Sequence, residues 1–471
     1  MLRTLIPPRI STLVTRLCTP VALCIPRQRQ HSGSSTSETT VAIEKVAPPT
    51  TAEPGVSING DNRDSPPSVI QSSFADVLKK MMDSDLRPQS SMGWPRKGPP
   101  PLDKSVDLIF FQTELIGNEL PDVDADAAMF GVTKDGNSIC IRIKRCTTSR
   151  SEITSDTKIP GMSWVKIPAT KIAHISGLDR RSHCQLELAV EWADIEIQPF
   201  EDAAPPPPLR ILSFDIECLG REDIFPEPEV DPVIQIGNMV SILGSPTPPF
   251  IRNIFTLDTC SEIPGADVIS FADEANLLQS WSDFVQEVDP DLIIGYNITG
   301  FDFPYLLARA KALQVLRFPF LGRLKEVETV RERTITYTIR EHTRSWEDIP
   351  LPGRLQLDLM QYIRREENQR SLSLNSVSKR FLGERKEDVH FTAIRGLQTG
   401  SADTRQRLAV YCLKDTYLPQ RLFDVLGCVD KYTAVAHEKG IQFNSILPDC
   451  EPVETMPMLP QPTTQILSSN C

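Results

Sequence analysis

The stretch Leu209-Arg-Ile-Leu-Ser-Phe-Asp-Ile-Glu217 predicts a buried strand that ends in two carboxylates. Successive side chains of a strand point to opposite faces, so Asp215 and Glu217 share one face. The other face carries the apolar side chains of Leu212, Phe214 and Ile216. Carboxylates at the end of an apolar strand cost free energy unless a cation compensates them, and hard divalent cations prefer carboxylate oxygens. Taken alone, the triplet fits a solvated strand end better, so a metal site depends on the residues that follow.

The composition is that of a soluble globular chain with long irregular stretches. Of 471 residues 40% are hydrophobic, which suits a globular core, whereas 40 prolines are more than such a core contains. No long apolar run occurs, so we expect no membrane span. The formal charge of −12 argues against unaided non-specific nucleic-acid binding but leaves room for a local basic track. The 11 cysteines include no Cys-x-x-Cys pair, which favours free thiols in an intracellular protein over a zinc site or a disulfide framework.

Residues 1–105 predict a basic leader followed by a disordered segment. Residues 1–37 hold five arginines and no acid, since Glu38 is the first acidic residue. An acid-poor, amphipathic start with arginines is typical of a mitochondrial transit peptide, although its prolines allow only a short helix. A disordered basic leader is the alternative. The polar residues 38–105 predict disorder, with one short helix at Phe74–Met82 as an exception.

Two structured regions follow, and the proline run of residues 203–208 separates them. Residues 106–200 predict a small β-rich domain, with a hairpin turn at Lys134–Asn137. Residues 205–430 predict one α/β domain with a mixed sheet, because a meander of strands gives way to strands that alternate with helices. We expect strands near residues 209–217, 232–240, 252–257, 291–295 and 355–362. We expect helices near residues 273–288, 304–313, 371–381 and 402–414, and a disordered tail over residues 431–471.

Further acids lie where this sheet could gather them. Asp302 follows the strand at residues 291–295, where it could equally cap the next helix. Tyr411 and Asp415 are four residues apart, so they share one face of a helix. A solvated aspartate beside a packed tyrosine is the plainer alternative. Each of these short patterns is weak evidence for a site by itself. Together they predict an acidic site beside the strand at residues 209–217.

These segments resemble a known family. Phe-Asp-Ile-Glu at 214–217, Gly-Tyr-Asn-Ile-Thr-Gly-Phe-Asp at 295–302 and Tyr-Cys-Leu-Lys-Asp at 411–415 resemble the three proofreading exonuclease motifs of family B DNA polymerases, and most of all those of the eukaryotic delta branch. The resemblance is strong over residues 209–426, weaker over 107–143 and 157–197, and not visible over 1–75 and 440–471. It implies a ribonuclease H-like mixed-sheet exonuclease domain preceded by a small, truncated β-rich amino-terminal domain.

The resemblance also implies a mechanism, namely metal-dependent 3′→5′ hydrolysis of the terminal phosphodiester with two ions, Mg²⁺ or Mn²⁺. In the family pattern Asp215 bridges the ions, while Glu217 and Asp415 complete the site of the water-activating ion. Asp302 holds the second ion through water, and Tyr411 orients the attacking water. Contacts to the terminal nucleotide are expected from Asn297, Phe301 and Phe214. For the ring of Phe301, packing in the core is an equal alternative.

The expected substrate is DNA with a single-stranded or frayed 3′ end, because an unpaired terminus enters a narrow site at little cost. Residues 362–386 hold seven basic side chains that could contact phosphates, although a solvated helix face explains them as well. The resemblance predicts the nucleus and contacts with replicative polymerase subunits. The alternative location, a mitochondrion, rests on residues 1–37.

Two departures from the family pattern leave alternatives for the function. A large piece between Lys144 and Thr157 is missing, and too little chain follows Asp415 for a polymerase palm. We therefore expect no polymerase activity. A 3′→5′ exodeoxyribonuclease is the favoured function. The alternatives are a catalytically idle decoy that binds DNA or a polymerase, and a truncated product of a DNA-directed DNA polymerase gene.

Overall fold

The computed structural model describes residues 73–85, 94–101, 103, 105–117, 127–144, 161–197, 205–222, 224–329, 333–339, 342–367, 369–387 and 389–446. These residues all lie in one compact unit of the chain. The leader at 1–37, the greater part of the polar stretch that follows it, and residues 447–471 lie outside the described residues, so the expectations for them stay untested.

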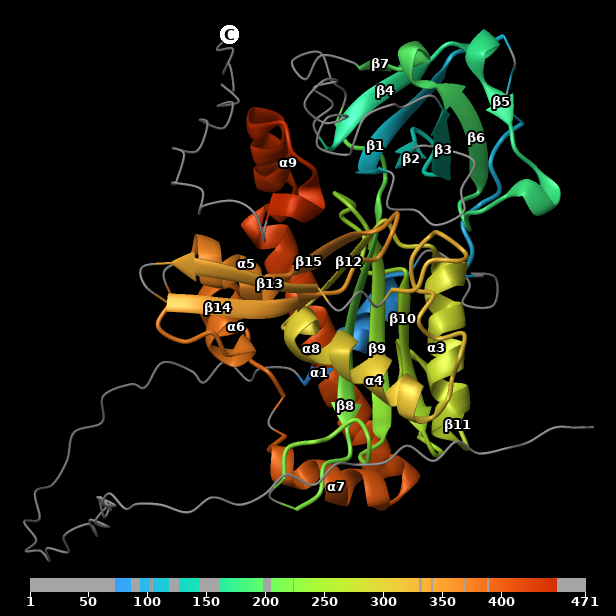
Figure 1. Ribbon diagram of the computed structural model, residues 1–471. Coiled ribbons are helices and arrows are strands. Elements are labelled where there is room, and N and C mark those ends of the chain that lie inside the picture. The colour runs from blue at the N-terminus through green and yellow to red at the C-terminus, as the bar shows by residue number, and fades with distance from the viewer. Residues whose placement is uncertain are drawn as a thin grey trace, which may run out of the picture. The chain divides into compact units, whose positions relative to one another are not determined.

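The first sheet contains seven strands and confirms a β-rich region after residue 106. The strands are β1 (Leu108–Ile116), β2 (Ala127–Thr133), β3 (Ser138–Lys144), β4 (Ser163–Ile167), β5 (Ala173–His174), β6 (Leu186–Glu191) and β7 (Glu196–Ile197). Their order is β5-β6-β3-β2-β1-β4-β7 (Figure 1). The expected hairpin joins β2 and β3, where the backbone N–H of Gly136, at φ 82°, donates to the carbonyl of Thr133. A positive φ of this kind favours glycine at the turn.

The second sheet is mixed, as the α/β prediction required. Its strands are β8 (Arg210–Cys218), β9 (Val233–Ile242), β10 (Ile251–Leu257), β11 (Asp267–Phe271), β12 (Leu292–Gly295) and β15 (Leu355–Asp358), in the order β11-β10-β9-β8-β12-β15. Strands β8, β9 and β10 pair antiparallel, whereas β12 and β15 run parallel to β8. The sequence did not indicate β11. A separate hairpin consists of β13 (Arg333–Ile339) and β14 (His342–Asp348).

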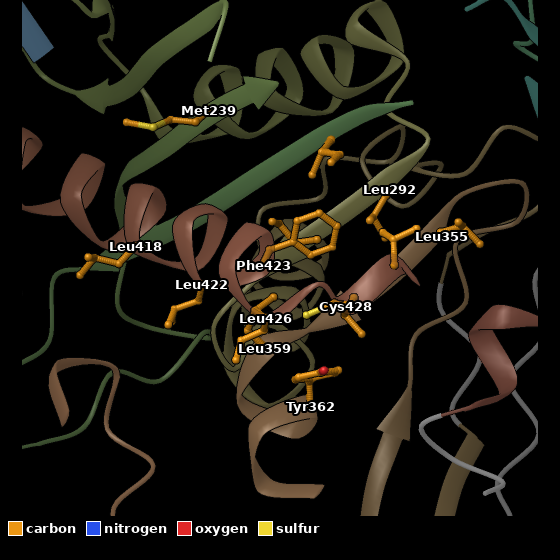
Figure 2. Packing of buried hydrophobic residues seen from close by; sticks show 14 of the residues in the cluster. Met239, Leu292, Leu355, Leu359, Tyr362, Leu418, Leu422, Phe423, Leu426 and Cys428 are labelled. Atoms are coloured by element: carbon orange, nitrogen blue, oxygen red, sulfur yellow. The ribbon is translucent and has the colours of Figure 1, made fainter. Parts of the chain in front are cut away.

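Helices cover both faces of the second sheet (Figure 1). In chain order, the helices are α1 (Phe74–Ser84), α3 (Glu274–Val288), α4 (Phe303–Ala312), α5 (Leu359–Glu366), α6 (Leu374–Leu382), α7 (Phe391–Thr399), α8 (Ala402–Leu426) and α9 (Cys428–Lys439). Side chains of α8 and α9 pack on one face of the sheet, and those of α3 and α4 pack on the other. Figure 2 shows Leu422, Phe423 and Leu426 of α8 in the first of these two cores, together with Leu292 and Leu355 of the sheet.

Four sequence expectations need correction. The strand expected near residues 355–362 ends at Asp358, whose side chain caps helix α5 from Leu359 onward. The short helix expected at Phe74–Met82 is confirmed as α1, with Phe74 and Leu78 buried in the core, whereas residues 94–101, for which disorder was expected, are ordered and include the buried Arg96. Helix α9 and the short turn after it occupy residues expected in a disordered tail. Helix α8 continues to Leu426, past the expected end at Lys414. Its interior Pro419 deprives only one helical hydrogen bond of its donor, and the apolar contacts of the last three turns offset that loss.

Candidate active site

The first two acids project from β8 toward α8. Leu209 and Ile211 of the same strand face belong to the core under α8, whereas Leu212 and Phe214 belong to the core on the α3 side. Asp215 therefore looks toward α8, and it is partly buried, while Glu217 is buried. The predicted alternation of the strand is thus realised, and both carboxylates lie at the helix-covered face near the end of the strand.

A glycine on the neighbouring strand lets α8 approach this face closely. Gly237 of β9 pairs with Asp215. A Cβ at Gly237 would lie 2.5 Å from Oγ1 of Thr416 and 3.1 Å from Sγ of Cys412. The Ser213 hydroxyl of β8 donates to the Thr416 carbonyl at 2.7 Å. A side chain on β9 would push the helix away, so this glycine brings the residues of α8 to the carboxylates of β8.

Asp415 lies where the regular bonding of α8 is interrupted. Because Pro419 has no N–H, the carbonyl of Asp415 loses its helical donor. One turn earlier, the Cys412 thiol donates to the carbonyl of Asp215 at 3.6 Å and lies 3.9 Å from its Oδ2. Asp415 is only 3% exposed. Helix α8 and strand β8 are therefore connected at the level of the acids.

Asp302 reaches the same place from a different element. It ends a π-helical turn, Ile298–Asp302, and its Oδ1 accepts a hydrogen bond of 3.1 Å from the backbone N–H of Ile216. Its side chain makes no capping hydrogen bond to α4. The alternative role, a helix cap, is therefore not the one that this side chain takes.

A second buried carboxylate holds the turn that carries Asp302. Asp358, at the end of β15, accepts backbone N–H bonds of 2.9 Å from Asn297 and 3.0 Å from Thr299. It also accepts the Thr299 hydroxyl at 2.7 Å. Asn297 has a left-handed backbone with φ of 67°, and a Cβ at Gly300 would lie 2.4 Å from its Oδ1. Asp358 thus positions the turn and has its own oxygens satisfied, a role that the sequence did not indicate.

Lys386 completes the cluster and was foreseen only as part of a basic track. Its Nζ forms an ion pair with Oδ2 of Asp415 and donates to the Tyr411 hydroxyl at 3.2 Å. It also lies 5.1 Å from the centre of the Tyr411 ring. Nothing in the segment Glu384-Arg-Lys-Glu387 marks one basic residue as special, because only the fold brings it to α8.

Burial and mutual repulsion make it unfavourable for all four carboxylates of the cluster to be charged at once. Burial raises the pKa of Asp215, Glu217, Asp302 and Asp415, and repulsion from neighbouring carboxylates adds to the rise at the first three. The pKa of Glu217 and that of Asp302 both reach about 8. Burial would lower the pKa of Lys386, but the charge of Asp415 outweighs it and keeps the ammonium group charged.

The cluster has the features of a cation site. Oδ1 of Asp415 is buried and has no hydrogen-bond partner among the described residues. Ligand atoms of Asp215, Glu217 and Cys412 lie within 4.8 Å of one another. A hard divalent cation would take the carboxylate oxygens and leave the thiol aside, because Mg²⁺ and Mn²⁺ prefer oxygen ligands. The residues therefore fit such an ion, which would relieve the repulsion among the acids.

The expected substrate contacts differ in their surroundings. Asn297 and Phe301 are partly buried next to Asp302. The Phe301 ring packs against Phe225 with centroids 5.5 Å apart, and Phe225 is 74% exposed. Phe214 is fully buried between Trp281 and Phe303 on the α3 side. Its side chain belongs to the core, which corrects the expectation that it touches substrate.

Comparisons with known proteins agree with this geometry. Residues 150–377 match the family described as DNA polymerase family B, exonuclease domain. The chain is 48% identical over 293 residues to the DNA polymerase delta catalytic subunit of Schizosaccharomyces pombe, which covers 62% of this chain and 27% of that protein. It is 46% identical over 306 residues to the same subunit of Oryza sativa, which covers 64% of this chain and 27% of that one. The chain thus spans little more than a quarter of these relatives.

A solved structure shows a similar fold. The family B DNA polymerase from the archaeon Pyrobaculum calidifontis superposes with a TM-score of 0.50 over 73% of this chain and 48% of that one, at 17% identity. These findings confirm the resemblance to family B DNA polymerases and the ribonuclease H-like α/β fold class. Tyr411, Asp415 and Lys386 lie beyond the segment 150–377 that the family model matches, and the geometry places them with the other acids.

Proposed function

We propose that this chain, which carries the exonuclease domain of family B DNA polymerases, removes nucleotides from the 3′ end of DNA. The observation that carries the proposal is the convergence of Asp215, Glu217, Asp302 and Asp415 from three separate parts of the chain, with one buried oxygen of Asp415 left without a partner. Both oxygens of the structural carboxylate Asp358 accept hydrogen bonds, whereas Oδ1 of Asp415 accepts none from the described residues. Burial and neighbouring carboxylates raise the pKa of Asp215 and of Glu217. Perturbed acids of this kind cluster at functional sites.

The four carboxylates would hold two divalent cations, Mg²⁺ or Mn²⁺. When bound, these ions would supply an activated water and stabilise the negative charge on the departing 3′ oxygen. Asp215 and Glu217 on β8, with Asp415 on α8, form one side of the proposed site. Asp302, which the Ile216 N–H orients, forms the other side.

Tyr411 and Lys386 would act on the substrate phosphate and water without forming a covalent bond. Burial raises the pKa of Tyr411, and the charges of Asp415 and Glu217 raise it further, so its hydroxyl keeps its proton. The Lys386 ammonium donates to the tyrosine oxygen, and the tyrosine hydroxyl donates to Asp415, so both contacts hold this hydroxyl beside the acids, where it could reach a water or a phosphate oxygen. Lys386 also adds a fixed positive charge beside the acids, where negative charge builds up during phosphodiester hydrolysis.

The proposed substrate is a single-stranded or frayed 3′ end. The exposed ring of Phe225 and the Phe301 ring beside it offer aromatic faces on which an unpaired base can stack. Asn297 lies at the start of the same turn. Three exposed basic side chains are available to phosphates, namely Arg370 before α6, Lys379 on α6 and Arg385 after it. A local track of this kind is needed because the whole chain is acidic.

The domain limits and surroundings follow from the same proposal. Residues 205–430 would form the nuclease domain, residues 106–200 its amino-terminal companion, and DNA and replicative polymerase subunits the partners. We propose the nucleus as the location, in keeping with the resemblance. No helix in the part of the chain that the structure describes is long and apolar enough to cross a membrane.

The test uses the full chain, a 5′-labelled single-stranded DNA and Mg²⁺ or Mn²⁺. We expect a ladder that shortens from the 3′ end and disappears with EDTA. The Asp215→Asn and Glu217→Gln double variant keeps the shape of the side chains and removes two metal ligands, so it should abolish the ladder. Asp283→Asn, on the exposed side of α3, is the matched control and should leave the ladder intact. Folded wild-type protein that binds DNA but gives no ladder at enzyme excess would support the decoy instead.

A further inference from the structure

The segment Gly383–Glu387, which carries Lys386, is fixed by its neighbours on both sides. Glu384 accepts hydrogen bonds from Nζ of Lys414 at 2.5 Å and from Arg421 at 3.2 Å, both on α8. The backbone N–H of Lys386 donates to Oδ1 of Asn375 on α6 at 3.3 Å. This segment is irregular, so its place depends on these side-chain contacts and not on a helix or a sheet.

The next residue, Glu387, connects this segment to helix α1. Its Oε1 accepts the backbone N–H of Phe74 at 2.9 Å, although the two residues are 313 positions apart in the sequence. Phe74 begins α1, where free N–H groups and the helix dipole favour a carboxylate. The ring of Phe74 lies 5.1 Å from that of Tyr417, and Nζ of Lys414 lies 4.9 Å from its centre. Helix α1 therefore contacts both Glu387 and the lysine that binds Glu384.

Helix α1 is itself docked firmly. Ser73 and Asp76 form a reciprocal capping box at its start. Leu78 is fully buried, and a Cβ at Gly265 would lie 2.1 Å from its carbonyl oxygen, so the helix backbone touches the sheet layer directly. At its far end Asp85 forms an ion pair of 2.5 Å with the buried Arg252. A helix anchored at both ends can hold another segment in place.

These contacts form one chain from α1 through Glu387 to Lys386 and on to Tyr411 and Asp415. The Lys386 side chain is 27% exposed and flexible, so its own burial does not fix it. We propose that α1 and Glu387 act as positioning elements that hold Lys386 among the acids of the site. This inference rests on the proposed nuclease function. It assigns a positioning role to helix α1, which precedes the first sheet and is more than 100 residues before the first motif in the sequence.

The first test asks whether the Lys386 side chain stays beside Asp415, and it does not require nuclease activity. The full chain is acetylated with a lysine-reactive ester, and the modification of each lysine is followed by peptide mass spectrometry. We expect Glu387→Ala and Phe74→Leu to raise the modification rate of Lys386 by about tenfold, since an ion pair held in place protects its ammonium group. Glu387→Gln keeps the acceptor oxygen and should restore protection. Lys80→Ala, on the exposed side of α1, is the control.

The second test is a double-mutant cycle on kcat and KM for single-stranded DNA. As a single variant, Glu387→Ala should lower kcat about tenfold and leave KM nearly unchanged. A displaced Lys386 ammonium slows the chemical step more than it weakens DNA binding. In a Lys386→Met background it should have no further effect, since it acts through that lysine. Additive losses in the cycle, or unchanged protection of Lys386 in folded Glu387→Ala protein, would overturn the inference. If no variant or wild-type protein cleaves DNA, the proposed function fails, and the labelling result still decides the positioning.

Discussion

Replacement of Gly237 by alanine tests whether the close approach of α8 to β9 builds the acidic site. The new methyl carbon would lie 2.5 Å from Oγ1 of Thr416, whereas an ordinary contact begins near 3.4 Å, so the two must separate by about 0.9 Å. The Thr416 hydroxyl cannot simply turn aside, because it donates to the Cys412 carbonyl at 2.9 Å and Sγ of Cys412 also crowds the methyl group at 3.1 Å. The helix backbone therefore has to move, and Asp415 moves with it.

Two measurements follow from that displacement. Overpacking of this kind should lower the free energy of unfolding by about 1–3 kcal/mol, which urea denaturation of the metal-free chain would detect. A shift of nearly 1 Å in a metal ligand should lower kcat on single-stranded DNA by about 100-fold. Gly396→Ala is the control: this residue lies in the exposed α7 with open space around it, so stability should stay equal or rise. If Gly237→Ala cleaves DNA at the wild-type rate and unfolds at the same urea concentration, the close approach does not position Asp415.

Three further predictions concern charge, substrate and the turn of Asp302. The pKa of Glu217 is raised from 4.5 to about 8, so the folded metal-free protein holds a proton that the unfolded chain releases, and its free energy of unfolding should fall as pH rises from about 5 to 8. Urea denaturation across this pH range should show a smaller fall for Glu217→Gln, with the remainder due to Asp302 and the other acids, and saturating Mg²⁺ should remove the fall. Phe225→Ala should weaken single-stranded DNA binding by about 1–3 kcal/mol in a fluorescence titration with little change in stability, and equal binding would refute stacking. Asp358→Asn should cost about 1–3 kcal/mol on unfolding and lower kcat, whereas full activity would show that this carboxylate does not hold Asp302.

The sequence predicted those parts of the fold in which local pattern and long-range packing agree. Strand β8 alternates as expected, and the acids of three distant motifs meet at one face of the mixed sheet. Helix α8 was predicted too short because packing on the sheet carries the helix past Lys414 and through Pro419, and the local sequence pattern does not show this packing. Helix α1 is short and lies in a polar stretch, so the sequence indicated the helix but not its docking through Phe74, Leu78 and Asp85.

The residues of the candidate site also divide into those that the sequence pattern indicated and those that only the fold brings together. Carboxylates at strand ends and at helical spacing leave a signal in the sequence, so Asp215, Glu217, Asp302 and Asp415 could be named. Lys386 and Asp358 could not, since their roles come from partners 25 or more positions away that no periodicity reveals. Phe214 was misjudged because its neighbour Asp215 faces the site, and the alternation of the strand necessarily turns Phe214 to the other side.

Ion pairs between buried side chains connect the segments around the second sheet. Arg323 is fully buried and binds Asp289 at 2.8 Å and Asp291 at 2.6 Å, and Arg96, from the stretch before the first sheet, binds the same two aspartates. Replacing Arg96 would remove one positive partner from the buried carboxylates of Asp289 and Asp291 and would therefore lower the free energy of unfolding. At the other end, Oε1 of Gln442 accepts hydrogen bonds from Gln112 and from the Leu115 N–H of β1. The first sheet and the residues after α9 therefore stabilise each other, and a fragment that keeps both the Phe74–Glu387 contact and the Gln442 contacts includes residues 74–442.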